Sequence, residues 1–147
     1  MDFLTSQNYE IFLRLILAVL LGSFIGLERQ LAKKTAGLRT FALVSLASCL
    51  FTTISNLLSQ MNFPNFNIAL LPMNIIGGIG FIGAGLIIFH GSHPTGITTA
   101  AGLLVSAAVG MAVGFGFYSI AVFTALLTIT IFTIFWIFEE KFLSKID

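Results

Sequence analysis

The feature that most constrains this chain is a long segment without charge. Residues 95–138 contain no Asp, Glu, Lys or Arg, and the segment is about twice as long as the roughly 20 residues that a helix needs to cross a bilayer. A break rich in glycine and aromatic residues at positions 114–118 divides it in two. We therefore predict two successive membrane-spanning helices, over residues 95–114 and 118–138.

The rest of the chain has the same apolar character. Hydrophobic residues make up 57% of the 147 residues and charged residues only 9%, whereas about a quarter of an ordinary soluble domain is charged. Polar breaks separate three further apolar stretches, which predict helices over residues 9–27, 37–58 and 68–89. The sequence thus predicts one domain over residues 1–147, an all-α, polytopic transmembrane bundle of about five helices.

Charge and cysteine content exclude several classes of protein and site. The net charge is only +1 and the few basic residues are clustered, which argues against nucleic-acid binding. Cys49 is the one cysteine in the sequence, so an intramolecular disulfide is excluded. His90 and His93 lie in a turn predicted at residues 90–94, and two ligands alone make a weak metal site. We predict neither a metal nor a cofactor.

The basic residues also predict how the chain is oriented. Lysine and arginine in short loops stay on the cytoplasmic side of a membrane. Four of them flank the first connection: Arg29, Lys33, Lys34 and Arg39. Five crossings then place the N-terminus outside the cell and the C-terminus inside, where Lys141 and Lys145 follow the last predicted helix.

Small side chains recur every fourth residue along two of the predicted helices. Ala18, Gly22 and Gly26 form such a stripe in the first helix, and Gly102, Ser106, Gly110 and Gly114 form one in the fourth. Helices in lipid associate where small residues let their backbones approach closely. We therefore expect both helices to be packed against others and not to face lipid.

Hydroxyl side chains share one face of the helix predicted at 37–58. Ser45, Ser48, Thr52 and Ser55 follow one another at intervals of three and four residues, which brings them to one side of a helix. Hydrogen bonding between helices is the first interpretation. A hydrophilic path for an ion or water is the second.

A glycine-rich run at residues 78–83 matches the dinucleotide-binding fingerprint by its letters. That fingerprint needs a strand before it and a helix after it, and here it lies inside an apolar run of helical length, so we expect no nucleotide. The run contains five glycines that we expect to permit tight packing or a broken helix: Gly77, Gly78, Gly80, Gly83 and Gly85.

Isolated polar residues within the apolar stretches are candidates for function. Arg14 is a charge inside the first predicted helix, where an ionisable group is a functional hypothesis by default. Its long side chain could instead extend to the membrane surface. Asn74 would join helices or line a site. Thr98 and Thr99 follow Gly96 at the start of the fourth predicted helix, where they would cap or pack it.

Charged residues at the first connection allow three interpretations. Arg39 lies close enough to Glu28 across the short loop to form an ion pair, which would be a structural clamp. With Lys33 and Lys34, the same region could contact anionic lipid headgroups. It could also be a docking surface for a partner protein, and we rank lipid contact first.

Four motifs in order resemble a known family. They are the run of residues 14–29, Gly-Leu-Arg-Thr at 37–40, Gly-Ile-Gly-Phe-Ile-Gly-Ala-Gly at 78–85 and Gly-Ile-Thr-Thr-Ala-Ala at 96–101. Together they resemble the MgtC/SapB family over roughly residues 10–138, and the ordered combination is more specific than any single glycine cluster. The positions that match the family pattern are Arg14, Gly22, Gly26, Glu28, Arg29, Arg39, Thr40, Gly80, Gly83, Gly85, Thr98 and Thr99.

These residues and Asn74 are our candidates for function or partner binding. The chain departs from the family at two positions, since Asn74 stands where glutamine is usual and Leu104 where tryptophan is frequent. We also expect the transmembrane domain alone, without the soluble C-terminal domain of the virulence-linked members.

The resemblance implies a multi-pass protein of the bacterial inner membrane that is linked to growth at low magnesium and to virulence. It implies partners in the membrane, with the proton-translocating ATP synthase as one candidate, and leaves self-association open. It therefore favours a regulator. Our first hypothesis is that this regulator binds another membrane protein through the small-residue stripes of the first and fourth predicted helices. A magnesium or small-ion transporter is the alternative, and no set of residues suggests an enzyme.

Overall fold

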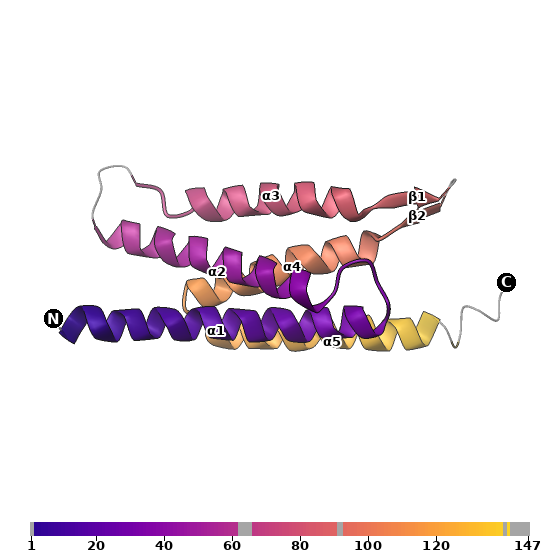
Figure 1. Ribbon diagram of the computed structural model, residues 1–147, viewed down its shortest axis with the longest axis horizontal. Coiled ribbons are helices and arrows are strands. Elements are labelled where there is room, and N and C mark those ends of the chain that lie inside the picture. The colour runs from indigo at the N-terminus through magenta and orange to yellow at the C-terminus, as the bar shows by residue number, and fades with distance from the viewer. Residues whose placement is uncertain (1, 62–65, 91–92, 140, 142–147) are drawn as a thin grey trace.

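In its described residues the chain forms five helices and one short hairpin (Figure 1). The computed structural model describes residues 2–61, 66–90, 93–139 and 141. The helices are α1 (Asp2–Leu31), α2 (Leu38–Gln60), α3 (Leu70–Leu86), α4 (Ile97–Gly114) and α5 (Tyr118–Phe138). Strands β1 (Ile88–His90) and β2 (His93–Thr95) pair antiparallel between α3 and α4. The predicted all-α bundle is confirmed.

The helices lie in three layers. Figure 1 shows α3 along one side of the molecule, α1 and α5 along the opposite side, and α2 and α4 between them. Helix α4 contacts the other four helices, whereas α3 packs mainly on α4 and less extensively on α2. The centre of the bundle is therefore α4. Helix α3, in which only Ile79 and Gly83 are buried, is the least enclosed helix.

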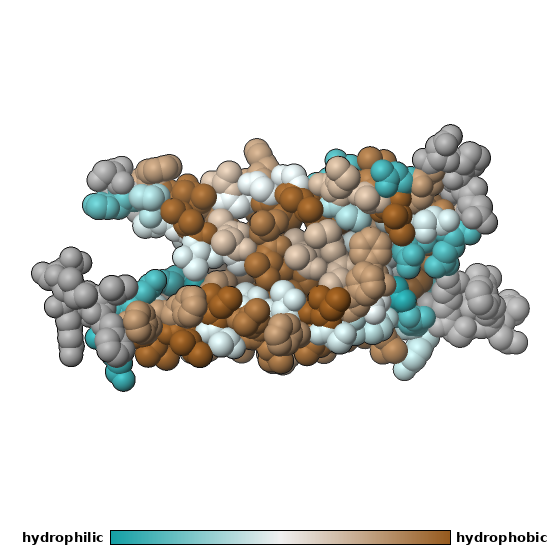
Figure 2. Space-filling model, turned by 180° about the vertical axis from the view of Figure 1, so that it is seen from behind, coloured by the Kyte–Doolittle hydropathy of each residue, from teal (hydrophilic) through white to brown (hydrophobic). Residues whose placement is uncertain are grey.

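Within the described parts of the chain, four helices are long and apolar enough to cross a membrane. These spans are Asn8–Leu31, Leu38–Gln60, Ile97–Gly114 and Tyr118–Phe138. Figure 2 shows hydrophobic residues over the middle of one face of the molecule and hydrophilic residues gathered toward its two ends. Large exposed side chains such as Phe24, Phe123 and Ile134 lie on the outside, as expected where lipid is the solvent.

Helix α3 is shorter than the third span, which we predicted over residues 68–89. It has 17 residues and so extends about 26 Å at 1.5 Å per residue, against a hydrocarbon core of about 30 Å. The backbone of Ile87 is extended, and residues 88–90 belong to β1 instead. The sequence did not indicate this end, because a short apolar run is compatible with either a strand or a helix. The predicted turn includes residues 91–92, which lie outside the described residues, as does Lys145.

The small-residue stripes of α1 and α4 are packed, as predicted. A Cβ added at Gly22 would lie 2.7 Å from the carbonyl oxygen of Phe41, and one at Gly26 would lie 2.8 Å from the Cα of Leu38. Gly110 of α4 lies against the backbone of Ser45. These glycines bring α1 and α4 into backbone contact with α2, so their spacing is used within the chain.

The hydroxyl groups of α2 and α4 do not all have the same role. Ser106 of α4 donates a 3.0 Å hydrogen bond to the carbonyl oxygen of Phe41, which joins two helices. Thr52 donates to Ser48 O within α2, and Ser55 donates to Ile68 O at 2.8 Å, outside any helix. The buried hydroxyls of Ser45 and Ser48 have no hydrogen-bond partner among the described residues. Among the described residues, none of the four α2 hydroxyls that we singled out bonds to another helix, so the first interpretation is wrong for that set. The bond between helices comes from Ser106 of α4 instead.

Candidate functional site

Residues that we singled out from two separate motifs surround one cavity of about 390 Å³. Its walls come from the end of α1, the loop that follows, the start of α4 and the last turns of α5. The lining includes Arg29, Lys34, Thr98, Thr99, Trp136 and Glu139. We call it the Arg29 cavity. It combines two cations, one carboxylate and aromatic walls, and it lies at an end of the bundle.

Arg29 is held firmly in the wall of this cavity. The residue is only 3% exposed, and its guanidinium carbon lies 3.7 Å from the centre of the Phe132 ring. Its Nε and Nη2 donate to the two carboxylate oxygens of Glu28, the second bond measuring 2.7 Å. The guanidinium of Arg29 is therefore paired with both the ring face of Phe132 and the carboxylate of Glu28. These two interactions offset the cost of burying its charge.

The predicted Glu28–Arg39 ion pair is wrong. In the described part of the chain the carboxylate of Glu28 pairs with its neighbour Arg29, because the stacking of Arg29 on Phe132 brings the guanidinium to it. Arg39 is exposed. It lines a separate crevice of about 310 Å³ with Gln30, Gly37 and Thr40.

Helix α4 begins beside the Arg29 cavity without the threonine cap that we considered. The residue before the helix is Gly96, with φ of +91°, and within the described chain no side chain caps this end. A side chain at Gly96 would collide with the carbonyl oxygen of Leu86. Thr99 is 2% exposed and packed, while Thr98 is exposed. Packing is therefore the right interpretation for Thr99, and both residues line the cavity.

Arg14 ties α1 to the connection between α4 and α5. Its Nη1 donates a 2.9 Å hydrogen bond to the carbonyl oxygen of Gly114, the last residue of α4. Its Nη2 forms an ion pair with Glu10, and the ring of Tyr118 lies 5.9 Å away. A cation at a helix C-terminus offsets the unpaired carbonyl groups there. Arg14 therefore links α1 to the C-terminal end of α4.

The glycines of α3 are open, in contrast to those of α1 and α4. Of the five, only Gly83 packs, since a Cβ added there would lie 3.5 Å from the Cβ of Ala100. Cβ atoms added at the other four would meet nothing within 4 Å in the described structure: Gly77, Gly78, Gly80 and Gly85. Our expectation that these glycines permit tight packing within the chain is wrong for these four, and α3 is not broken either.

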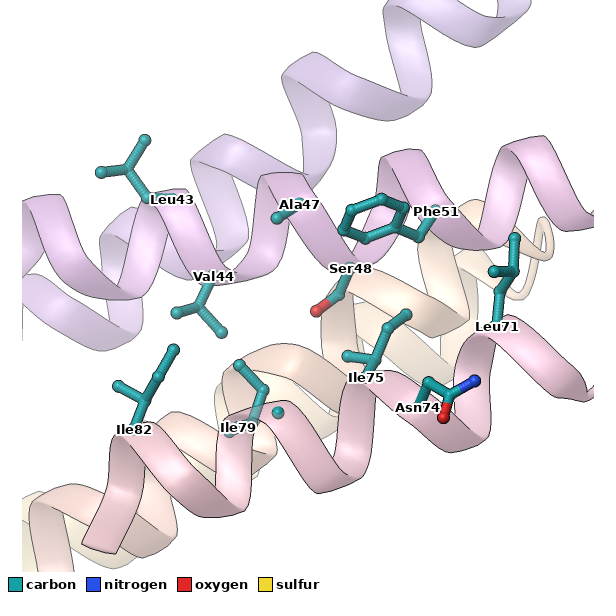
Figure 3. A pocket seen from close by; sticks show the side chains of 11 residues that line it. Leu43, Val44, Ala47, Ser48, Phe51, Leu71, Asn74, Ile75, Ile79 and Ile82 are labelled. Carbon is teal, nitrogen blue, oxygen red and sulfur yellow. The ribbon is translucent and has the colours of Figure 1, made fainter. Parts of the chain in front are cut away.

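A groove of about 490 Å³ separates α2 from α3 (Figure 3). It is lined mainly by apolar side chains, with Ser48 of α2 and Asn74 of α3 as its polar members. Asn74 is exposed and donates from Nδ2 to Leu70 O at 3.0 Å. We call this feature the α2–α3 groove. The sequence indicated its polar residues but not the groove itself, because glycine spacing does not show which neighbour, if any, fills the space.

The candidate residues thus separate into distinct places. Arg29, Thr98 and Thr99 meet at the Arg29 cavity, with Glu28 bonded to Arg29. Arg39 and Thr40 share the crevice, and Asn74 lies on the α2–α3 groove. Gly22 and Gly26 lie in the contact between α1 and α2. In the part of the chain that the structure describes, no three His, Cys, Asp or Glu side chains gather as metal ligands.

Comparison with known proteins finds relatives in several bacteria. The chain is 33% identical over 140 residues to the protein named "Putative magnesium transporter YhiD" of Escherichia coli strain K12, a match that covers 92% of this chain and 65% of that protein. It is 40% identical over 128 residues to protein SapB of Bacillus subtilis, covering 83% of this chain and 54% of SapB.

Protein MgtC of Brucella abortus is 44% identical over 102 residues, which cover 69% of this chain and 41% of that protein. The chain therefore spans between 41% and 65% of the length of these relatives. No solved structure matches. The model of the MgtC family matches residues 15–141, which include all but one of our candidate residues. This chain belongs to the MgtC family.

Proposed function

We propose that this protein is a regulator in the bacterial inner membrane, linked to magnesium homeostasis, that acts by binding another membrane protein. The observation that carries the proposal is the open surface of α3, where four glycines meet no other part of the described chain. Helices in lipid associate through such small residues because apolar burial alone gives no driving force there. The proposal includes no catalytic reaction.

The corresponding glycines of α1 and α4 do not support partner binding. Gly22, Gly26 and Gly110 are in contact with the backbone of α2, so a partner could not reach them without unfolding the bundle. We had considered these stripes as the partner surface. The proposal now rests on α3, in which only Ile79 and Gly83 are buried.

The link to magnesium comes from the relatives. The name of the YhiD relative refers to magnesium transport, and the family resemblance implies a link to growth at low magnesium. The inner membrane and the ATP synthase as a partner are likewise implied by the family. We propose the inner membrane as the location of this protein. The ATP synthase and a second copy of this chain are two partners that the experiment can identify.

The test compares substitutions on two exposed helix surfaces. Replacing Gly77 and Gly78 of α3 together by leucine should remove partner copurification in gentle detergent and reduce growth of cells at low magnesium. Thr130→Leu on α5 is the matched control, since Thr130 is exposed and its hydroxyl bonds within its own helix. Growth and copurification unchanged by the α3 double substitution would refute the proposal.

Magnesium transport is the second candidate, and the name of the YhiD relative favours it. Magnesium flux into vesicles that contain the purified protein, above the flux into protein-free vesicles, would support this candidate over the regulator. A regulator predicts flux equal to that of the protein-free vesicles, together with a recoverable partner.

A further inference from the structure

The α2–α3 groove has apolar walls on both sides. Leu43, Ala47 and Phe51 line it from α2, and Ile75, Ile79 and Ile82 line it from α3 (Figure 3). Along α3 its lining runs from residue 71 to residue 82, about 17 Å at 1.5 Å per residue. That length matches about three turns of a helix.

One polar group is buried in this groove without a partner. Ser48 is 1% exposed, and its hydroxyl has no hydrogen-bond partner in the described part of the protein. Figure 3 shows the hydroxyl directed into the space between α2 and α3. Thr52, one turn later, does bond to a backbone carbonyl of its own helix. The unsatisfied donor and acceptor of Ser48 therefore favour an occupant that offers hydrogen bonds.

The depth of Ser48 excludes the simplest occupants. Counting from Leu38, Ser48 is the eleventh of the 23 residues of α2, so it lies near the middle of the span, where water is scarce. A lipid chain would fill the apolar part of the groove but offers nothing to the hydroxyl. A protein segment at this depth must be helical, because its backbone groups have to be satisfied internally.

Gly78 makes room for such a helix. It lines the groove, and a Cβ there would meet nothing within 4 Å of the described chain, so a partner backbone could approach α3 closely at this point. Gly77 is equally free of contacts but does not line the groove. The two neighbours therefore provide a built-in comparison.

We propose that the α2–α3 groove receives one transmembrane helix of a partner protein, and that Ser48 hydrogen-bonds to a polar side chain at the middle of that helix. The partner is thus an apolar single helix with one Asn, Gln, Ser or Thr at mid-span. This inference rests on the proposed function, since it specifies where and by what chemistry the regulator holds its partner.

The experiment uses a designed single-span peptide of leucine and alanine with one central asparagine, and the same peptide with leucine in its place. The full chain is reconstituted in phosphatidylcholine vesicles with a donor dye on Lys34→Cys, and each peptide carries an acceptor dye. Cys49 is buried and remains unlabelled. The asparagine peptide should bind about three- to tenfold more tightly than the leucine peptide, the range of one hydrogen bond between helices in a membrane.

Three variants identify the groove. Ser48→Ala should remove the advantage of the asparagine peptide, while binding of the leucine peptide is unchanged. Gly78→Leu should weaken binding of both peptides more than Gly77→Leu does, because Gly78 lines the groove and Gly77 does not. Leucine stabilises a helix more than glycine does, so α3 should persist in both variants, and circular dichroism checks this.

Equal binding of the two peptides, or equal effects of Gly78→Leu and Gly77→Leu, would overturn the inference. Energy transfer between two labelled copies without peptide, abolished by Gly78→Leu, would overturn it in favour of self-association. The proposed function fails separately. If the peptides bind as expected but the α3 double substitution does not change growth at low magnesium, the inference about the groove is supported and the proposed regulatory role is wrong.

Discussion

Arg29 and Glu28 form the more enclosed of the two ion pairs in the described chain, with side chains 4% and 18% exposed. Breaking a buried pair leaves one charge without a partner, which costs more than replacing both members. We therefore expect Arg29→Met to lower the free energy of unfolding by about 3 kcal/mol, the low end for a buried pair. Arg29→Met combined with Glu28→Gln should cost less than Arg29→Met alone.

Thermal unfolding in detergent, followed by circular dichroism, measures both variants. Arg39→Met is the control, since Arg39 is exposed and forms no ion pair with the described residues. It should change stability little. If the double variant is as unstable as Arg29→Met, then the stacking of Arg29 on Phe132, and not its pairing with Glu28, holds this end of α1.

Two buried serines should respond differently to loss of their hydroxyl. Ser106 donates to Phe41 O, so Ser106→Ala should cost about 1 kcal/mol of stability. The hydroxyl of Ser48 has no such bond to any described residue, so Ser48→Ala should be neutral or stabilising. The same unfolding assay on the protein without its partner compares them. A larger loss for Ser48→Ala than for Ser106→Ala would show that Ser48 is satisfied within the chain.

At the scale of helices, the same residue type has two roles that packing decides. Gly110 lies against the backbone of Ser45, which cannot move aside, whereas Gly80 has open space around it in the described structure. Gly110→Ala should therefore separate α4 from α2 and lower stability by more than about 2 kcal/mol, as overpacking does. Gly80→Ala should raise stability by up to about 1 kcal/mol, the difference in helix propensity.

Unfolding of both alanine variants in one detergent tests this contrast, because the side chain added is the same. Gly83→Ala is an intermediate case, since its Cβ would lie 3.5 Å from Ala100, an ordinary contact. It should be close to wild type. Equal losses of stability for Gly110→Ala and Gly80→Ala would mean that α3 is packed as tightly as α4. The surface of α3 would then no longer support partner binding.

The sequence predicted the helices well where polar breaks or glycines mark their ends. Helix α5 begins and ends as predicted at residues 118 and 138, and α4 ends at Gly114. Helix α1 begins earlier than predicted, at Asp2, and α3 ends earlier, at Leu86. The end of α3 was not predictable from pattern, because residues 77–89 are apolar throughout and no cap or charge separates the helix from β1.

The site was predicted less completely, because contacts between distant residues depend on packing. Glu28 and Arg39 are close along the chain, yet Glu28 pairs with Arg29, whose position depends on Phe132 in another helix. Glycine spacing was equally suggestive at Gly22 and Gly80, but only Gly22 has a helix against it. A single sequence shows which residues permit close approach and does not show what approaches.

The whole molecule combines a tightly packed part with a loosely attached helix. Helices α1, α2 and α4 are joined by backbone contacts at glycines, and Arg14 fastens α1 to the end of α4. Helix α3 is attached mainly through α4, and the groove between it and α2 is open. A partner helix could therefore enter beside α3 without disturbing the other contacts, which would suit a protein that binds and releases a partner.

The orientation of the whole molecule follows from its basic residues. Lys33, Lys34 and Arg39 are exposed near the α1–α2 connection, and such clusters stay on the cytoplasmic side. We predict that a thiol at Lys33→Cys reacts with a membrane-impermeant reagent only from the cytoplasm. Asn8→Cys, near the opposite end of α1 and also exposed, should react from the periplasm. Buried Cys49 should not react, so labelling in intact and in opened cells reports the added thiols alone. Labelling of Lys33→Cys in intact cells would reverse the orientation and place the Arg29 cavity on the outer surface, away from cytoplasmic partners.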